Sequence, residues 1–422
     1  MDSIQTIPPW LIPVTSWTLI QTLTGLTATF TPSASSLRYV AAATTALLAY
    51  ILQASIEIHY AGARPSGPLV AMCWVNVLNA IDLLLLSRAS FDAYLSYRRR
   101  KREKKDIPHS DSEDGSFDSI KSKLIFSLTL PYNYRRINTP WQLSRVPVLT
   151  PSSFPSSLTL TNRRKFLLHS AFKLVLAIAI MHIPTLDPSN STLLHAVLQL
   201  DPSKSVLLLP LRAFTERKGI HALWLQARFT LAFGIVIRAT IVAAYTAASI
   251  LAVMLGGDPA EWPPVAGGLS EAWTLNRLWG QAWHQTLRRP LASNATFLAT
   301  LFGFAPRSTG AHWIRVLISF VESGVIHSAC DLGFGIPYEK SGGLAFFTLQ
   351  ILGLLIESVF QGFIERVGFR TGTRLSRMVG YVWVSVFLLW TTPLWANPIL
   401  VSLASDGVRV MSPWLGLPAG SF

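Results

Sequence analysis

Long apolar segments are the feature that most constrains how this chain of 422 residues can fold. Eight segments are predominantly apolar and near or above the roughly 20 residues that a helix needs to cross a bilayer. They are 10–30, 40–58, 69–86, 166–183, 222–255, 312–330, 344–363 and 379–394. In hydrocarbon every backbone polar group must find a partner inside the protein, and a helix provides these partners within one segment. The sequence therefore predicts an all-α, polytopic integral membrane protein with about eight transmembrane helices.

Composition agrees with a membrane protein and argues against a soluble, nucleic-acid-binding, disulfide-rich or zinc-binding protein. Charged residues make up 14% of the chain, compared with about 25% in soluble proteins. The net charge of +14 lies largely in short clusters beside apolar segments, which is typical of topology signals, so we expect a bilayer partner and no nucleic acid. The two cysteines, Cys73 and Cys330, lie in apolar segments and form neither a disulfide framework nor a zinc pattern. We expect no metal and no bound cofactor.

The order of charge clusters and apolar segments predicts that the chain has three regions. Residues 1–97 carry the first transmembrane helices, 98–164 form a basic and acidic cytosolic loop, and 165–422 form the main transmembrane core. The basic cluster at 98–105 favours the cytosolic side. Three crossings before it place the N-terminus in the lumen, and a fourth returns the chain there at Asn190. Asn190 begins a sequon and is therefore a candidate glycosylation site.

One histidine, His327, lies in the middle of the apolar segment 312–330. An ionisable side chain inside a membrane segment indicates a function. Ser323 and Asp331 are four residues before and after it, so a helix places all three on one face. A carboxylate that orients an imidazole is typical of a general base. The alternative is a buried histidine that bonds to a carbonyl of a neighbouring helix.

The segment 269–291 is too interrupted by polar residues to cross a membrane, and an amphipathic helix in the interface is expected there. Its aromatic, amide and basic residues are Trp273, Trp279, Trp283, Asn276, Gln281, Arg277, Arg288 and Arg289. Helical spacing would place His284 over Gly280 with indoles beside it. The alternative, which spacing alone favours, is a belt of tryptophans with an uninvolved histidine.

Three further polar features interrupt the apolar pattern. The turn around Arg135 and Arg136 is interpreted as interfacial, with its arginines at lipid headgroups and Trp141 at the boundary. Asp82 lies inside an apolar segment and is expected either near the interface or paired with another helix. Arg238 is costly in the segment 222–255, so it either faces a polar cavity or marks a break.

Three stretches together resemble one family. They are Arg136-Ile137-Asn138-Thr139-Pro140-Trp141, Leu278-Trp279-Gly280-Gln281-Ala282-Trp283-His284-Gln285 and Phe320-Val321-Glu322-Ser323-Gly324-Val325-Ile326-His327. In this order they resemble the wax-synthase-like branch of the membrane-bound O-acyltransferases. More narrowly, the chain is similar to fungal acetyltransferases that act on terpenoids and meroterpenoids, from about residue 130 to about 400. It departs from the family pattern at Leu278 and at the pair 281–282.

The resemblance implies that His327 is the catalytic histidine and that His284 is the second polar residue of the active site. It implies acetyl-CoA as co-substrate, a hydroxylated terpenoid as acceptor and a location in the endoplasmic reticulum. His284 and the amides of Asn276 and Gln281 are then candidate donors to the thioester oxygen.

Three arginines in this region, Arg277, Arg288 and Arg289, are candidates for binding the phosphates of CoA. Within the enzyme class one alternative stays open, a long-chain wax synthase or sterol O-acyltransferase. The spacing of residues in the sequence does not determine how long an acyl chain the site can hold. A secondary transporter is a different class. It is disfavoured because the sequence shows neither internal repeats nor paired broken helices.

Overall fold

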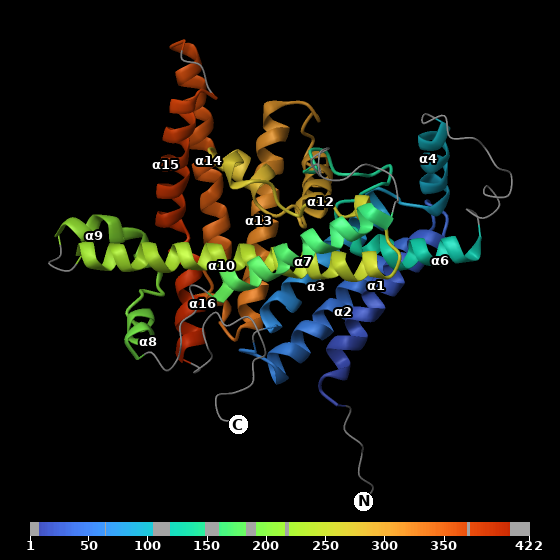
Figure 1. The fold of residues 1–422 in the computed structure, drawn as a ribbon, viewed down its shortest axis with the longest axis horizontal. Helices are drawn as coiled ribbons and strands as arrows, with labels where there is room; N and C mark the ends of the chain where they lie inside the picture. Colours follow the sequence, from blue (N-terminus) through green and yellow to red (C-terminus); the bar gives the residue numbers. More distant parts are fainter. Residues whose placement is uncertain are drawn as a thin grey trace, which may run out of the picture. The chain divides into compact units, whose positions relative to one another are not determined.

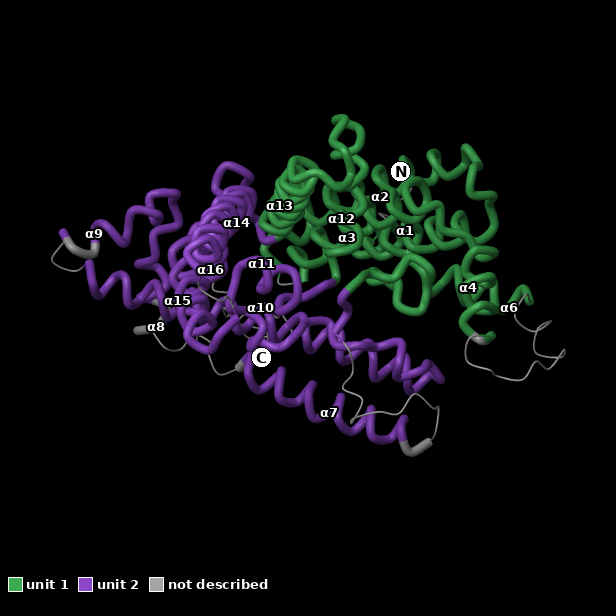
Figure 2. The backbone as a smooth tube through the Cα atoms, turned by 90° about the horizontal axis from the view of Figure 1, so that it is seen from above, with its two compact units in different colours: residues 1–144, 286–333 green, residues 145–285, 334–422 purple. Residues whose placement is uncertain are grey.

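The computed structural model of the chain describes residues 8–63, 65–103, 119–147, 160–182, 191–215, 219–368 and 372–405. These residues form helices and connecting turns (Figure 1), and the strand-like pairing among them is one isolated bridge between Ala266 and His284. The predicted all-α class is confirmed. The chain divides into two compact units, each made of two separate stretches (Figure 2). Unit 1 contains 1–144 and 286–333, and unit 2 contains 145–285 and 334–422.

Unit 1 is a bundle built on three consecutive helices. Its helices are α1 (Leu11–Phe30), α2 (Leu37–His59), α3 (Ser66–Ile81), α4 (Phe91–Glu103), α6 (Ile120–Thr129), α12 (Arg288–Leu301) and α13 (Thr309–Gly333), with the short turns η1 (Asp82–Leu86) and η2 (Leu130–Tyr132). Helix α1 packs on α2 and α6, and α2 packs on α3. Helix α13 packs against α3 and α12. The bundle therefore fixes α13 from two sides.

The contact between α1 and α6 depends on a missing side chain at Gly25. A Cβ atom added there would overlap the carbonyl oxygen of Ser127 on α6. We expect Gly25→Ala to lower the free energy of unfolding by about 1–3 kcal/mol, because the two helices must move apart. Thermal unfolding of the detergent-purified protein measures this. Gly234→Ala is the matched control, since a Cβ at Gly234 meets nothing within 4 Å. Equal loss in the two variants would contradict the expectation.

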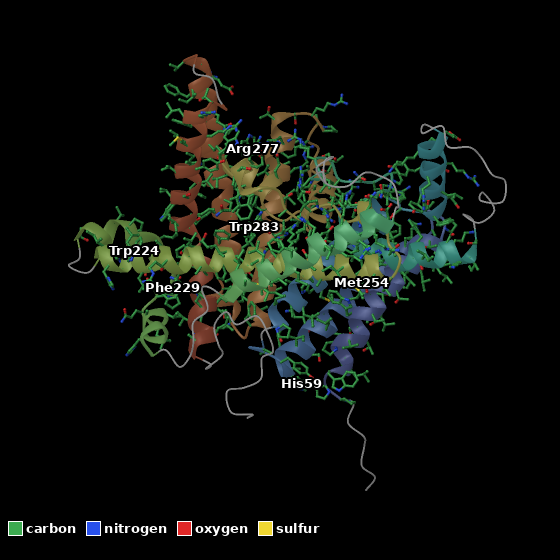
Figure 3. All side chains as sticks on the ribbon, in the orientation of Figure 1. His59, Trp224, Phe229, Met254, Arg277 and Trp283 are labelled. Carbon is green, nitrogen blue, oxygen red and sulfur yellow. The ribbon has the colours of Figure 1, made fainter. Side chains whose placement is uncertain are left out.

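Unit 2 combines a pair of long helices that pack along each other with a second set of helices. Its helices are α7 (Leu160–His182), α8 (Ser191–Leu198), α9 (Leu209–Thr215), α10 (Gly219–Met254), α11 (Leu275–Arg277), α14 (Gly343–Arg366), α15 (Arg374–Thr391) and α16 (Pro393–Ser405), with the turns η3 (Lys204–Leu208), η4 (Pro259–Glu261), η5 (Leu269–Glu271), η6 (Leu278–Ala282) and η7 (Tyr338–Lys340). Helix α10 packs along α7, and Trp224 and Met254 mark its two ends in Figure 3.

Helix α10 runs across the direction of α14 and α15 (Figure 1). These three helices therefore cannot all stand parallel to one membrane normal. Within α10 the structure also answers a question left by the sequence. Residues 222–254 lie in a single continuous helix, α10, of 36 residues and not in a broken pair, so Arg238 does not mark a break.

Among the described residues, five helical segments are long and apolar enough to cross a membrane. They are Leu37–His59, Ser66–Leu86, Gly219–Met254, Thr309–Gly333 and Tyr338–Arg366. A sixth arises if Arg374–Thr391 and Pro393–Ala404, bent by 49°, form one span. The polytopic architecture is confirmed, but the expected eight spans are not. Residues 11–30 and 166–182 of two further predicted segments do form helices, in α1 and α7, without meeting this criterion.

Candidate active site

His327 has one ring nitrogen fixed by its own helix. Its Nδ1 lies 2.6 Å from the carbonyl oxygen of Ser323, one turn earlier in α13, and 3.5 Å from the Ser323 hydroxyl. A carbonyl oxygen only accepts hydrogen bonds, so Nδ1–H is the donor. In the neutral imidazole Nε2 then carries the lone pair. The arrangement leaves Nε2 as the basic nitrogen, which is the state that a general base requires.

The end of α13 that follows His327 is tightly packed. Ser328 and Asp331 are buried, with Asp331 fully enclosed. At Gly333 an added Cβ would lie 2.7 Å from the carbonyl oxygen of Ser66 at the start of α3. The helix therefore holds His327 on a rigid support. Ser323 is predicted to lie on the same helix face as His327, and its atom nearest to Nδ1 is the backbone carbonyl oxygen. This carbonyl belongs to α13 itself rather than to a neighbouring helix. The orienting role of Asp331 stays a prediction.

The stretch expected to be one amphipathic helix, 269–291, is not continuous, and its residues up to Gln285 belong to unit 2. Short helical turns end at Ala282, and Trp283 has an extended backbone with φ −78° and ψ 170°. The chain on either side of Trp283 pairs with residues 265–267. Gly267 N–H donates to the carbonyl of Gln281 at 2.9 Å, and Gln285 N–H donates to the carbonyl of Val265 at 2.9 Å. A Cβ at Gly267 would lie 2.6 Å from the same Gln281 oxygen, so the close approach requires glycine.

The broken helix changes how the tryptophans and His284 are arranged. Trp279 and Trp283 still meet, edge to face, with ring centroids 5.9 Å apart. Trp279 also packs near Phe347 of α14 at 6.0 Å, and the His284 ring is 5.8 Å from that of Trp283. The predicted stacking of His284 over Gly280 at helical spacing is wrong, because His284 lies beyond the end of the helical turn. A Cβ at Gly280 would meet nothing within 4 Å.

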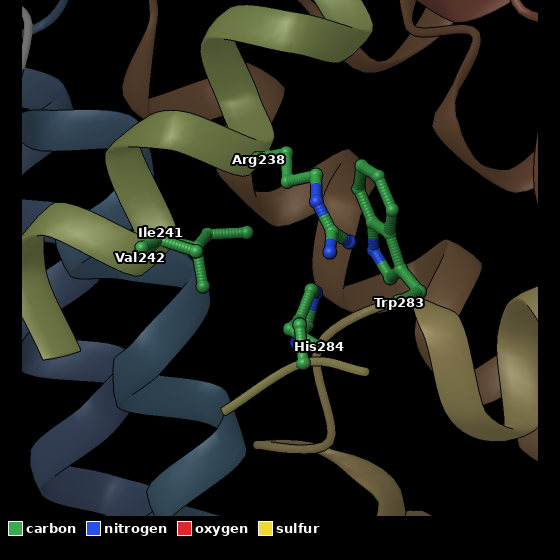
Figure 4. A pocket seen from close by; sticks show the side chains of 6 residues that line it. Arg238, Ile241, Val242, Trp283 and His284 are labelled. Atoms are coloured by element: carbon green, nitrogen blue, oxygen red, sulfur yellow. The ribbon is translucent and has the colours of Figure 1, made fainter. Parts of the chain in front are cut away.

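Arg238 of α10 contacts this loop, and its function was not predicted from the sequence. Its guanidinium donates to the carbonyl of Ala282 at 2.6 Å and to that of Gly267 at 2.7 Å. Together with His284 and Trp283 it lines a small hollow (Figure 4). The hollow is too narrow to hold a water molecule, so a ligand enters it only if side chains move. The sequence signal was an arginine in the middle of a long, largely apolar segment.

Glu357 of α14 anchors the beginning of the same loop. Its buried carboxylate accepts the backbone N–H groups of Leu275 at 2.6 Å and Asn276 at 3.2 Å. The Asn276 side chain itself is exposed. These two bonds start the helical turn that carries Leu278 and Trp279. Glu357, which is 82 residues from Leu275, therefore sets where the tryptophan-rich stretch begins.

We expect Glu357→Ala to lower the free energy of unfolding by about 1–3 kcal/mol, because two buried N–H groups lose a charged acceptor. Glu357→Gln keeps one carbonyl oxygen as an acceptor and should lose less. Denaturant unfolding in detergent measures both values. A larger loss for the glutamine variant would show that the carboxylate has another role.

The three candidate phosphate ligands all have protein acceptors. Arg277 pairs with Glu271 and lies over the Trp273 ring, 4.8 Å from its centroid. Arg288 donates to the carbonyl of Ser144 at 3.3 Å. Arg289 belongs to unit 1, whereas Arg277 belongs to unit 2. Phosphate binding by these residues remains a prediction. Gln281, a candidate amide donor, contributes its backbone carbonyl to the extended pairing described above.

Arg136 of the first family stretch is buried in an ion-pair network. Its guanidinium is 3.0 Å from the Asp82 carboxylate and 2.7 Å from the Asn79 amide oxygen, and its φ of 55° is left-handed. Burial lowers the pKa of Arg136, and the facing Asp82 carboxylate opposes this effect. Arg135 is buried as well. The interpretation that these two arginines meet lipid headgroups is therefore wrong, whereas the expected pairing of Asp82 is confirmed.

The glycosylation candidate Asn190 lies outside the described residues. A second sequon in the sequence begins at Asn294, which the structure does describe. The Asn294 side-chain nitrogen donates to the carbonyls of Leu78 at 3.2 Å and Pro290 at 2.8 Å. A buried amide held in this way is not accessible to a glycosyltransferase in the folded protein.

Comparison with known proteins connects these features. Residues 262–349, which include the tryptophan-rich loop and His327, match the sequence profile described as "Membrane bound O-acyl transferase family". Acetyltransferase aurG of Calcarisporium arbuscula is 27% identical over 416 residues, covering 93% of each chain. The chain thus resembles the membrane-bound O-acyltransferase family in residues 262–349 and this acetyltransferase over most of its length. Acetyltransferase nanB of Aspergillus nanangensis is 28% identical over 309 residues, covering 69% of this chain and 71% of its own.

A third fungal relative, acetyltransferase spyB of Aspergillus fumigatus, is 30% identical over 305 residues, which cover 66% of this chain and 48% of its own. With these matches and its apolar helices, the chain is an acyltransferase and an integral membrane protein. The enzyme class is confirmed over the transporter alternative.

Proposed function

We propose that this O-acyltransferase moves an acetyl group from acetyl-CoA to a hydroxyl group of a terpenoid or meroterpenoid in fungal secondary metabolism. The relatives described above are acetyltransferases of fungi, which supports acetyl-CoA as the donor. The observation that carries the chemistry is the hydrogen bond from His327 Nδ1–H to the Ser323 carbonyl. It leaves Nε2 free of a proton and able to act as a base.

In the proposed reaction His327 Nε2 accepts the acceptor's hydroxyl proton while the hydroxyl oxygen attacks the carbonyl carbon of the thioester. The resulting oxyanion then collapses, the carbon–sulfur bond breaks, and the imidazolium returns its proton to the CoA thiolate. The products are an acetate ester and free CoA. A positioned base of this kind contributes about 10²–10⁴-fold to the rate.

His284 is the proposed donor to the developing oxyanion, because it lines the hollow at Arg238 whereas the Asn276 side chain is exposed. Trp279 and Trp283 supply apolar surface for a polycyclic acceptor. Arg277 is partly exposed and is the stronger candidate for the CoA phosphates.

The proposed location is the endoplasmic reticulum, where Asn190 faces the lumen and carries a glycan. A membrane site admits an apolar acceptor from the bilayer and limits hydrolysis of the thioester by water. Loss of apparent mass after endoglycosidase treatment, absent in Asn190→Gln, would support this location. An identical electrophoretic pattern for both proteins would contradict it.

The reaction is tested with microsomes that contain the wild-type enzyme or His327→Ala at equal protein levels. Acetyl-CoA and palmitoyl-CoA are offered in competition with hydroxylated terpenoids, a sterol and a long-chain alcohol, and products are identified by mass. A gain of one acetyl group with the wild type alone supports the proposal. Transfer from palmitoyl-CoA to the sterol or the long-chain alcohol, without acetyl transfer, would overturn it in favour of a sterol acyltransferase or wax synthase.

A further inference from the structure

We propose that Arg238 is a positioning residue that holds the Trp283–His284 loop in its reactive geometry, an inference that rests on the role proposed for His284. Arg238 lies in the middle of α10, between Ile237 and Ala239, ten residues after Arg228, the other arginine of this largely apolar helix. A guanidinium in such a segment is unfavourable unless it has specific partners. Its partners identify what it does.

Both hydrogen-bond partners of the Arg238 guanidinium are backbone carbonyls of the same loop. One guanidinium nitrogen donates to Ala282, immediately before Trp283, and the other donates to Gly267 in the paired segment. Among the residues that the structure describes, no carboxylate lies within 4 Å of this guanidinium. Arg238 therefore acts on the backbone of the loop rather than in an ion pair.

The two carbonyls belong to the two segments that form the short extended pairing. Ala266 and His284 are bridged across it, and Gly267 N–H bonds to the carbonyl of Gln281. Arg238 thus ties both segments to α10 at the point where the chain leaves the helical turn and becomes extended. The guanidinium points into the hollow beside His284 and Trp283 (Figure 4).

Arginine suits this position for a geometric reason. Its planar guanidinium presents several N–H groups in a rigid fork, so it can hold two carbonyls of separate segments at once. A lysine has the same charge but a single, freely rotating ammonium group on a flexible stem. Arg238→Lys therefore keeps the charge and removes the fork.

A matched control exists at the end of the same helix. Arg163 of α7 donates to the carbonyls of Val253 at 3.0 Å and Gly257 at 3.5 Å, which close the C-terminal end of α10. It holds two backbone carbonyls, as Arg238 does, but in a different loop from His284. Arg163→Lys makes the same chemical change without touching the proposed site.

We expect Arg238→Lys to fold and to lower kcat for acetyl transfer by roughly 10–100-fold, because a displaced donor stabilises the oxyanion poorly. Arg163→Lys should keep kcat within about twofold, the scatter allowed by context. The melting temperature of each purified variant is measured beside kcat and KM. Equal losses of kcat in the two variants would overturn the proposal.

The decisive measurement is the double variant of Arg238→Lys and His284→Ala. If Arg238 acts through His284, the double variant is no slower than His284→Ala alone, since the two effects are not additive. If the activity losses of the two single variants multiply in the double variant, Arg238 has a separate structural role, and the proposal is overturned. Full activity of His284→Ala would instead refute the proposed role of His284, a failure that is distinguishable because it is seen before Arg238 is changed.

Discussion

His327→Asn is expected to reduce acetyl transfer by about 10²–10⁴-fold while leaving the protein folded, because it removes the proposed base without removing its support. The amide nitrogen of asparagine lies close to the place of Nδ1 and can donate to the same Ser323 carbonyl. Asparagine has no counterpart of the Nε2 lone pair. Single-turnover assays in microsomes, normalised to the amount of enzyme, measure the loss.

Ser323→Ala is the matched control for this variant. It removes the hydroxyl, which lies 3.5 Å from Nδ1, but keeps the carbonyl at 2.6 Å. We expect most of the activity to remain, since the backbone and not the side chain holds the imidazole. A wild-type rate in the asparagine variant would refute His327 as the base. A loss in the alanine variant as large as in the asparagine variant would assign the orienting role to the hydroxyl.

Asp82→Ala is expected to lower the free energy of unfolding by about 3–5 kcal/mol, because a buried cation loses its counter-ion. Asp82 faces two guanidinium groups, that of Arg136 at 3.0 Å and that of Arg289 at 3.4 Å. Arg136 and Asp82 are both fully enclosed, so water does not replace the lost charge. Denaturant unfolding in detergent, supported by size-exclusion profiles of the purified protein, measures the effect.

Arg289→Gln provides the comparison. The Arg289 side chain is 27% exposed, so solvent screens its pairing and we expect a loss of only about 1 kcal/mol. It also donates to Ser87 at 2.7 Å, a bond that glutamine can replace in part. If Arg289→Gln were as destabilising as Asp82→Ala, the ranking would be wrong. A raised KM for acetyl-CoA at unchanged stability would support the phosphate role that the sequence suggested for Arg289.

Local composition was enough to predict the helices and the segment that carries His327, because lipid solvent leaves few alternatives to a helix. It was not enough to predict what the buried charges contact. Asp82 is 54 residues from Arg136 and 207 from Arg289, so only tertiary packing brings them together. Rules based on helical spacing apply only to residues that are close in the chain. They therefore give no information about partners at such separations.

The same reason explains the error at 269–291. Its tryptophans and arginines suited an amphipathic helix, and the local pattern carried no signal for the extended residues after Ala282. The helical turn instead begins where Glu357 of α14 accepts two N–H groups. It ends at Ala282, whose carbonyl accepts a hydrogen bond from the Arg238 guanidinium of α10. Both determinants lie outside the segment. Arg238 itself was recognisable from the sequence as unusual, but its partners were not.

The interleaving of the two units has a consequence for how the protein is made. Synthesis proceeds from the N-terminus, and a unit can finish folding only after its last stretch has been synthesised. Helices α12 and α13 cover α3 but arrive after 145–285 has already left the ribosome. Unit 2 in turn waits for α14, α15 and α16. A chain that stops at residue 285 therefore contains neither unit complete.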